Sequence, residues 1–243
     1  MTDALDRGPA MAVTATGRSG PVISRRWVLL ASAAGAVGAV GLGASFGILP
    51  KPPPLNGPLA VLIRYAAGHQ HAMMAAAWLE GSGTLLYVIF ALALVHLAGD
   101  RAGLAGRVAT MASAVVVAVS LVYDVTLIAI AQSASLGGQQ ATTATVAYGL
   151  FAAAEHAFLL APPLLLPLGL ILLRTPILPR PFAVLAVILG VTSPVLGLVG
   201  LFTVTANNNG PVGAAINALV ALDGLWVLAA AVMLPLRHPE RCE

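Results

Sequence analysis

The sequence predicts an all-α integral membrane protein, a bundle of six transmembrane helices with both termini in the cytoplasm. Three observations predict this fold class: 59% of the 243 residues are hydrophobic, only 9% are charged, and the apolar residues form long runs. An ordinary soluble domain carries roughly 25% charged residues, so a soluble globular fold is excluded. The mean hydropathy of +0.93 fits a chain whose solvent is mainly lipid.

Each apolar run can cross a hydrocarbon core of about 30 Å, which takes roughly 20 helical residues. The runs are too long for barrel strands of about 9 to 11 residues and lack their period of two. Helices therefore remain as the way to satisfy backbone amides in lipid. The predicted spans cover residues 27–49, 73–98, 108–131, 145–173, 182–205 and 213–236 within a membrane domain of residues 25–237. Residues 1–24 and 238–243 are predicted cytoplasmic tails, the first of them mobile.

The first span runs from Trp27 to the prolines that begin at Pro50, which cannot continue a helix. The preceding Ser24-Arg25-Arg26 is similar to a twin-arginine export motif, and processing at this segment or a first helix anchored by arginine both stay open. Small residues recur every four positions along the span and predict a surface for a membrane-helix partner or a second copy of the chain: Gly35, Ala39, Gly43 and Gly47.

The later spans are also long apolar runs, and two of them contain prolines that predict bends or interruptions. These are Pro162, Pro163 and Pro167 in the fourth span, and Pro194 after Thr192 and Ser193 in the fifth.

The positions of lysine and arginine predict the orientation. Ten basic residues fall in the tails and in the second and fourth connections, whereas the opposite side has Lys51 and Arg64. The positive-inside rule places the ten in the cytoplasm. The net charge of +3 therefore reflects orientation in a bilayer, and nucleic acid is not a predicted partner.

Four carboxylates inside the apolar runs are the candidate functional residues: Glu80, Asp124, Glu155 and Asp223. A charged side chain at the bilayer centre costs about 2.5 to 3.5 kcal/mol even on the most lenient scale. No lysine or arginine lies in a span core, so protonation, a bound cation or water must compensate. Counting residues from the predicted outer ends at 1.5 Å each places all four roughly 10 to 15 Å below the outer surface, in one layer.

Helical spacing predicts which side chains share a helix face with these acids. Met73, Ala76, Glu80, Thr84 and Tyr87 share one face of the second span, with His69 at its outer end, and Ser113, Ser120 and Asp124 share a face of the third. Glu80, Asp124, Glu155, Asp223, Thr84, Tyr87 and Ser120 are therefore predicted to bind a ligand or protons. His156 and His69 join the four acids as candidate metal ligands, and the identity of any metal or cofactor stays open.

Three interpretations compete. Acids converging from several helices could bind a cation or carry protons in a small transporter. Neutral acids could instead hold helices together by hydrogen bonds in a membrane scaffold or accessory subunit. The third is an intramembrane metal-dependent enzyme, although no catalytic residue is assigned. The single Cys242 excludes a thiolate metal cage, and no nucleotide-binding, nucleophile-elbow or zinc-protease motif is present.

Short motifs in order along the chain resemble a bacterial membrane family, domain-of-unknown-function family 4386. They are Trp78-Leu79-Glu80, Tyr123-Asp124, Ala157-Phe158-Leu159-Leu160, Leu178-Pro179-Arg180-Pro181, and Asp223 with Trp226. The family pattern has Glu where this chain has Asp124 and Asp223, and often an arginine where Leu121 stands, so the family's counter-ion is missing here. The resemblance implies six helices in the bacterial cytoplasmic membrane and no established activity.

Overall fold

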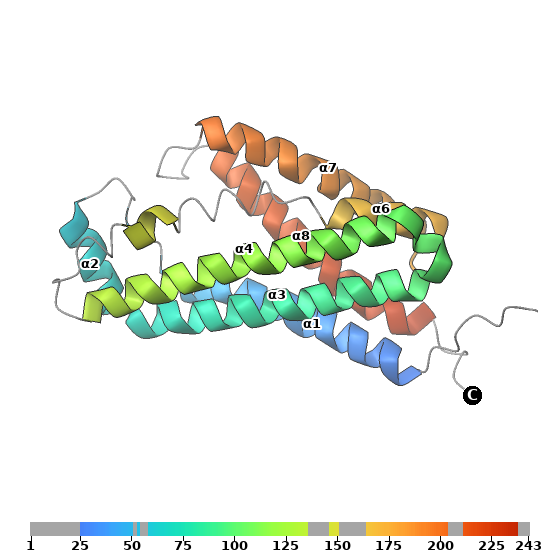
Figure 1. Cartoon of the computed structure of the whole chain (residues 1–243), viewed down its shortest axis with the longest axis horizontal. Coiled ribbons are helices and arrows are strands. Elements are labelled where there is room, and N and C mark those ends of the chain that lie inside the picture. Colours follow the sequence, from blue (N-terminus) through green and yellow to red (C-terminus); the bar gives the residue numbers. More distant parts are fainter. Residues whose placement is uncertain are drawn as a thin grey trace, which may run out of the picture.

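The computed structural model describes residues 25–50, 53, 58–135, 146–150, 164–203 and 211–237. All regular structure in these ranges is helical, which confirms the predicted all-α class (Figure 1). The elements are α1 (Arg25–Ile48), α2 (Leu59–Gly68), α3 (Gln70–Ala98), the 3₁₀ turn η1 (Gly99–Ala102), α4 (Gly103–Ser135), a helical segment over residues 146–150, α6 (Leu165–Arg174), α7 (Arg180–Thr203) and α8 (Pro211–Arg237).

Five of these helices are long and apolar enough to cross a membrane: α1, α3, α4, α7 and α8. They correspond to five of the six predicted spans. The predicted fourth span, 145–173, lies mostly outside the described residues, and its described part α6 has only 10 residues. A sixth span therefore stays a prediction. Both predicted tails, residues 1–24 and 238–243, also lie outside the described residues.

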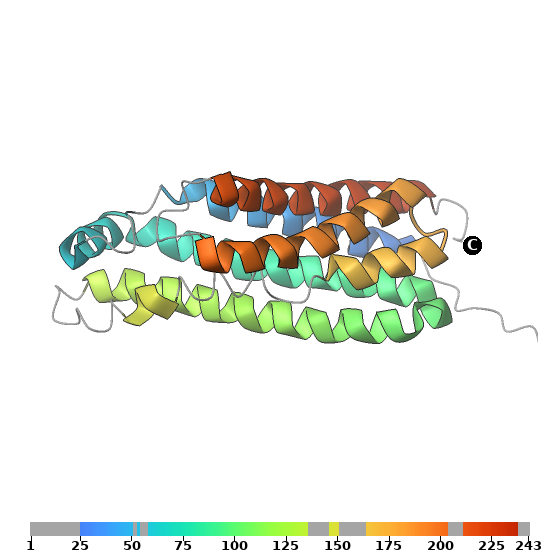
Figure 2. The same cartoon turned by 90° about the horizontal axis from the view of Figure 1, so that it is seen from above.

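Six of the described helices pack around the bundle in a closed ring, each against two neighbours. α1 packs between α3 and α8, α4 packs on the other side of α3, and α6 and α7 complete the circuit from α4 to α8. Figure 2 shows these helices running side by side along the length of the molecule. The predicted first span is thus an integral part of the bundle.

Glycines allow α1 and α3 to approach backbone to backbone. A Cβ on Gly38 would lie 2.8 Å from the Tyr87 nitrogen and 2.9 Å from the Gly83 oxygen, and one on Gly83 would lie 3.0 Å from the Gly38 oxygen. Real Cβ atoms essentially never come closer than 3.0 Å to such atoms. The close crossing of these helices therefore requires glycine at Gly38.

The contact face of α1 differs from the predicted stripe. Gly35 packs on Phe90, but a Cβ on Gly43 or Gly47 would meet nothing within 4 Å. The buried face instead contains Gly35, Gly38 and Ser45, because a helix of 3.6 residues per turn moves a strict four-residue repeat around its axis. The partner surface predicted at Gly43 and Gly47 is thus exposed and has room for side chains.

A tight turn makes α3 and α4 an antiparallel hairpin. Gly99, the first residue of η1, and Gly103, the residue after it, have φ of 54° and 49°, the left-handed region that side chains with a Cβ disfavour. The two glycines let the chain reverse within the four residues of η1.

Two local expectations need correction. The first connection contains α2, where the sequence indicated only a loop with Arg64, because its 10 residues are too few for a predicted span. α7 continues through Pro194, so of the two alternatives, a bend or an interruption, the interruption is wrong. The Thr192 and Ser193 hydroxyls donate to the Ile188 and Leu189 carbonyls at 2.9 and 2.8 Å, so these side chains bond within their own helix.

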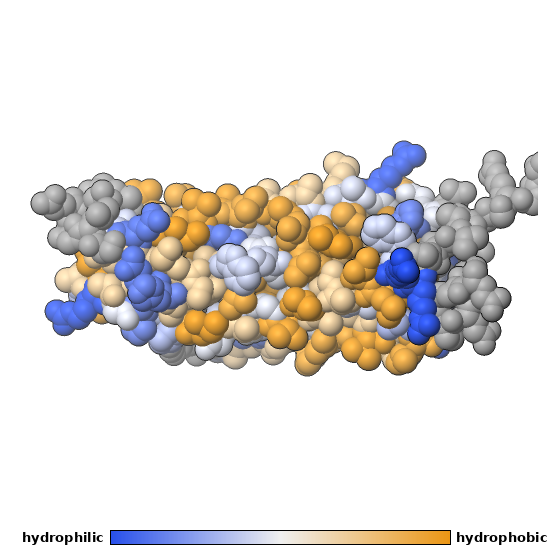
Figure 3. Space-filling model, turned by 90° about the horizontal axis from the view of Figure 1, so that it is seen from below, coloured by the Kyte–Doolittle hydropathy of each residue, from blue (hydrophilic) through white to orange (hydrophobic). Residues whose placement is uncertain are grey.

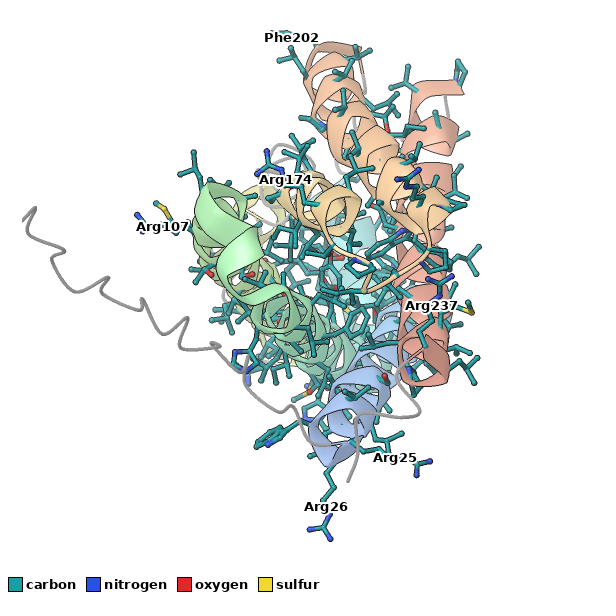
Figure 4. The ribbon with its side chains drawn as sticks, turned by 90° about the vertical axis from the view of Figure 1, so that its right-hand side faces the viewer. Arg25, Arg26, Arg107, Arg174, Phe202 and Arg237 are labelled. Atoms are coloured by element: carbon teal, nitrogen blue, oxygen red, sulfur yellow. The ribbon has the colours of Figure 1, made fainter. Side chains whose placement is uncertain are left out.

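Apart from Arg64 in α2, the arginine side chains in the described part of the chain gather at one end of the bundle, which we call the basic end. Figure 4 looks onto this end and shows Arg25, Arg26, Arg107, Arg174 and Arg237, contributed by α1, α4, α6 and α8. Phe202, near the other end of α7, is 81% exposed and points away from the bundle. In Figure 3 the middle of the visible face is mostly apolar, and the most hydrophilic residues gather toward both ends. This distribution fits a polytopic membrane protein.

Candidate functional site

The candidate site lies where the apolar core of the bundle is interrupted. A core at the basic end and a second core near α2, the far core, are separate clusters. On α3 the buried core residues stop at Ala77 and resume at Val88, and on α4 they stop at Val116 and resume at Leu127. Five predicted site residues fall in this gap, which we call the polar interval: Glu80, Thr84, Tyr87, Ser120 and Asp124.

Asp124 of α4 is only 6% exposed and packs directly on α3. A Cβ placed on Gly81 would lie 2.5 Å from its Oδ2, so the missing side chain of Gly81 provides the space for this carboxyl group. The other oxygen, Oδ1, is buried and has no hydrogen-bond partner among the described residues. A buried acceptor without a donor costs on the order of 1 to 3 kcal/mol.

Thr84 and Ser120 connect the same two helices one turn away. The Ser120 hydroxyl donates a hydrogen bond of 3.2 Å to Thr84 Oγ1, and both side chains are at most 3% exposed. Sequence spacing predicted that both would face inward, and the structure brings them together. In the apolar bundle interior such a bond contributes on the order of 0.6 to 2 kcal/mol.

Asp223 reaches the interior from α8. Its Oδ1 is buried without a hydrogen-bond partner in the described part of the chain, and its carboxyl group lies within electrostatic range of the Tyr87 hydroxyl. Tyr87 and Gly81 are six positions apart on α3, which is about 9 Å of helical rise. Asp124 packs on α3 at Gly81, and Asp223 lies within electrostatic range of α3 at a separate position, Tyr87.

The remaining candidates are placed less centrally or lie outside the described residues. Glu80 is half-buried on α3 beside Gly81. Glu155 and His156 lie outside the described residues. His69 sits at the junction of α2 and α3, where its Nδ1 donates to the Tyr65 carbonyl at 2.8 Å. Its ring also stacks on that of Tyr65 at 4.6 Å, so the structure does not bring His69 together with the acids.

The described acids and histidines do not form a multidentate metal site. Within the ranges that the structure describes, no three of the His, Cys, Asp and Glu side chains are grouped to hold a metal ion. The Tyr87 hydroxyl lies within electrostatic range of Asp223, and Ser120 precedes Asp124 by four residues on α4. Separate carboxyl groups, each with one unsatisfied oxygen, are suited to bind a proton, because a protonated carboxyl group remains a hydrogen-bond acceptor as well as a donor.

Gly81 is a site residue that the sequence analysis missed. The signal was present, because Gly81 and Gly83 flank Ser82 inside an apolar span. Each glycine in a helix interior costs about 1 kcal/mol relative to alanine, and an isolated glycine in a helical pattern often has a packing reason.

No protein family, curated protein or solved structure is similar enough to this chain to match it. Functional inference therefore depends on the polar interval and on Asp223.

Proposed function

We propose that this protein binds and releases protons inside its helix bundle, as part of a small proton-coupled transporter of the bacterial cytoplasmic membrane. Asp124 and Asp223 are the proposed proton carriers, with Glu80 and Glu155 as further candidates. Thr84, Tyr87 and Ser120 are proposed to supply the hydroxyl groups along the path. The resemblance to domain-of-unknown-function family 4386 belongs to the same proposal and implies no substrate.

One observation carries the proposal: two aspartates from different helices each hold a buried carboxyl oxygen without a partner among the described residues. An acid that served only to connect helices would be expected to direct both oxygens at donors, since unsatisfied buried acceptors are rare. The low dielectric of the interior favours the neutral form, whereas contact with water favours the ionised form. A change in hydration would therefore move a proton.

The orientation in the membrane is part of the proposal. The arginines of the basic end support a cytoplasmic position for this end. Both termini would then be cytoplasmic, and the polar interval would lie in the outer half of the bilayer.

The test is direct detection of proton binding. The full chain would be reconstituted into lipid, and difference infrared spectra would follow the carboxylic acid carbonyl band across a pH series. We expect Asp124→Asn and Asp223→Asn each to remove part of this band. Asp100→Asn makes the same change in η1, outside the helices that could cross the membrane, and should leave the band intact.

Transport is tested with the same variants in sealed vesicles that contain a pH-sensitive dye. An imposed pH difference should dissipate faster with the wild-type protein and the Asp100→Asn control than with Asp124→Asn or Asp223→Asn. Absence of any titrating carboxyl band would contradict proton binding. A titrating band without faster dissipation would contradict transport alone.

A second candidate, the membrane scaffold, is favoured by the hydrogen bond between Ser120 and Thr84 and by the open surface at Gly43 and Gly47. In this function the acids act only as neutral hydrogen-bonding groups. Asp124→Asn would then lower the melting temperature, and no proton uptake would be lost because none would occur.

A further inference from the structure

We propose that a hollow at the basic end binds the phosphate headgroup of an anionic phospholipid. The hollow encloses about 540 Å³ between the end of α6, the connection over residues 175–179, the start of α7 and the end of α8. Three arginines from these three helices line it: Arg174, Arg180 and Arg237. No acidic residue is among its described lining residues.

The three guanidinium groups are available to a ligand. All three side chains are exposed, and none has a hydrogen bond or ion pair with another residue in the described ranges. Arginine presents a planar fork of N–H donors that matches the oxygens of a phosphate. Three positive charges around one hollow without a counter-ion predict an anion of this kind.

The apolar part of the lining indicates that the phosphate belongs to a lipid. Leu172 and Leu178 are buried in the floor of the hollow, and Leu173 is 47% exposed beside Arg174. Large apolar side chains continue along the outer surfaces of α6 and α7, where Leu170, Val184 and Leu185 are 39%, 48% and 41% exposed. A headgroup in the hollow would therefore leave its acyl chains on an apolar helix surface. Basic pockets between transmembrane helices on the cytoplasmic side are suited to anionic headgroups.

The basic end also supplies a matched control for charge alone. Arg25, Arg26 and Arg107 lie at the same end of the bundle, as Figure 4 shows, but do not line the hollow. Replacing three arginines by glutamine in either set removes the same charge from the same end. A general attraction to anionic membranes would weaken equally in both variants.

The experiment is native mass spectrometry of the full chain in detergent with added phosphatidylglycerol, and phosphatidylethanolamine as the zwitterionic reference. We expect the wild-type protein to retain phosphatidylglycerol preferentially. The variant R174Q/R180Q/R237Q should lower the binding constant for phosphatidylglycerol by about 100-fold, since each of the three arginines adds roughly fivefold. The control R25Q/R26Q/R107Q should change it by less than about twofold.

Two further arms keep the test decisive. The variant R174K/R180K/R237K retains the charge and should still lose part of the binding, because lysine lacks the planar fork. If the glutamine variant fails to fold, this variant and the lipid preference of the wild-type protein still test the proposal. Equal losses in both glutamine variants would overturn it, as would displacement of the lipid by an equal concentration of inorganic phosphate.

Discussion

The two sides of α3 make different kinds of contact, one with the backbone of α1 and one with polar side chains of α4. On the side toward α1, Gly83 lies against Gly38 and the two backbones come as close as their atoms permit. On the side toward α4, Gly81 leaves room for the carboxyl group of Asp124, and Thr84 accepts a hydrogen bond from Ser120. Two glycines only two positions apart thus serve a backbone contact and a polar contact.

This difference shows which interface holds the bundle together and which one can do chemistry. A glycine contact depends on van der Waals packing alone and is the usual basis of helix association in lipid. The α3–α4 contact includes a buried carboxyl oxygen without a partner among the described residues, which reduces stability. Polar groups that reduce stability inside a membrane helix are typical of functional sites.

The largest expected effect comes from Gly38→Ala. The new Cβ would lie 2.8 Å from the Tyr87 nitrogen and 2.9 Å from the Gly83 oxygen, so α1 and α3 must separate. Overpacking of this kind typically costs about 1 to 3 kcal/mol, measured by thermal unfolding in detergent. Gly43→Ala is the control on the same helix, and the better helix propensity of alanine should leave it neutral or stabilised by up to about 1 kcal/mol. Equal melting temperatures for the two variants would contradict the close crossing.

An intermediate effect is expected for Gly81→Ala, because its Cβ would lie 2.5 Å from Asp124 Oδ2. The carboxyl group is the end of a side chain and can move, so the cost should be smaller than for Gly38→Ala. In the double variant Gly81→Ala/Asp124→Ala the clash disappears. The two single costs should therefore exceed the cost of the double variant by about 0.5 to 3 kcal/mol. Strict additivity in this cycle would show that Gly81 and Asp124 are not in contact.

A smaller effect is expected for Thr84→Val, which keeps the shape of the side chain and removes the acceptor of the Ser120 hydrogen bond. The loss should be about 0.5 to 1.5 kcal/mol in the free energy of unfolding. Thr110→Val is the control on α4, because Thr110 is exposed and bonds only to the Gly106 carbonyl of its own helix. A loss as large in the control would assign the effect to the threonine type and not to the contact between helices.

The smallest effect concerns Tyr65 in α2, outside the helices long enough to span the membrane. Burial raises the pKa of Tyr65 above its ordinary value of 10.0, and its hydroxyl donates to the Pro50 carbonyl. The folded protein therefore holds this proton more tightly than the unfolded chain. The resulting stabilisation is complete below pH 10.0 and is lost as the pH rises through the higher folded value.

The measurement for Tyr65 is the ultraviolet difference titration between the wild-type protein and Tyr65→Phe. We expect the difference between the two titrations, which is the ionisation of Tyr65, to lie above pH 10.0. The variant should also lose slightly less stability than the wild-type protein at alkaline pH. An ionisation at or below the ordinary value would contradict the burial of this hydroxyl.

Much of the fold could be predicted because apolar run length is a direct consequence of bilayer thickness. The predicted span 73–98 matches the end of α3 at Ala98, and 213–236 differs from α8 by two residues at its start and one at its end. The inward positions of Thr84, Ser120 and Asp124 followed from helical spacing. The bounds of a helix and its inward face depend on the sequence of that helix alone.

The contacts between helices could not be predicted in the same way. Counting residues from helix ends predicts a common depth for the acids, but depth along each helix does not say which side chains of neighbouring helices meet. The four-residue stripe of small residues on α1 predicts a surface for a partner, and that prediction does not say which face of α1 meets α3. Crossing angles and relative shifts between helices depend on the packed side chains of both partners.

The tight turn at η1 has a consequence for how the chain enters the membrane. With four residues between α3 and α4, the second helix of the hairpin cannot reach the bilayer far from the first. A helix that carried Asp124 into lipid alone would meet the insertion cost of about 2.5 to 3.5 kcal/mol for its carboxyl group. As a hairpin, α4 would insert with Gly81 and Thr84 already beside it, and the aspartate would be shielded from the acyl chains from the start.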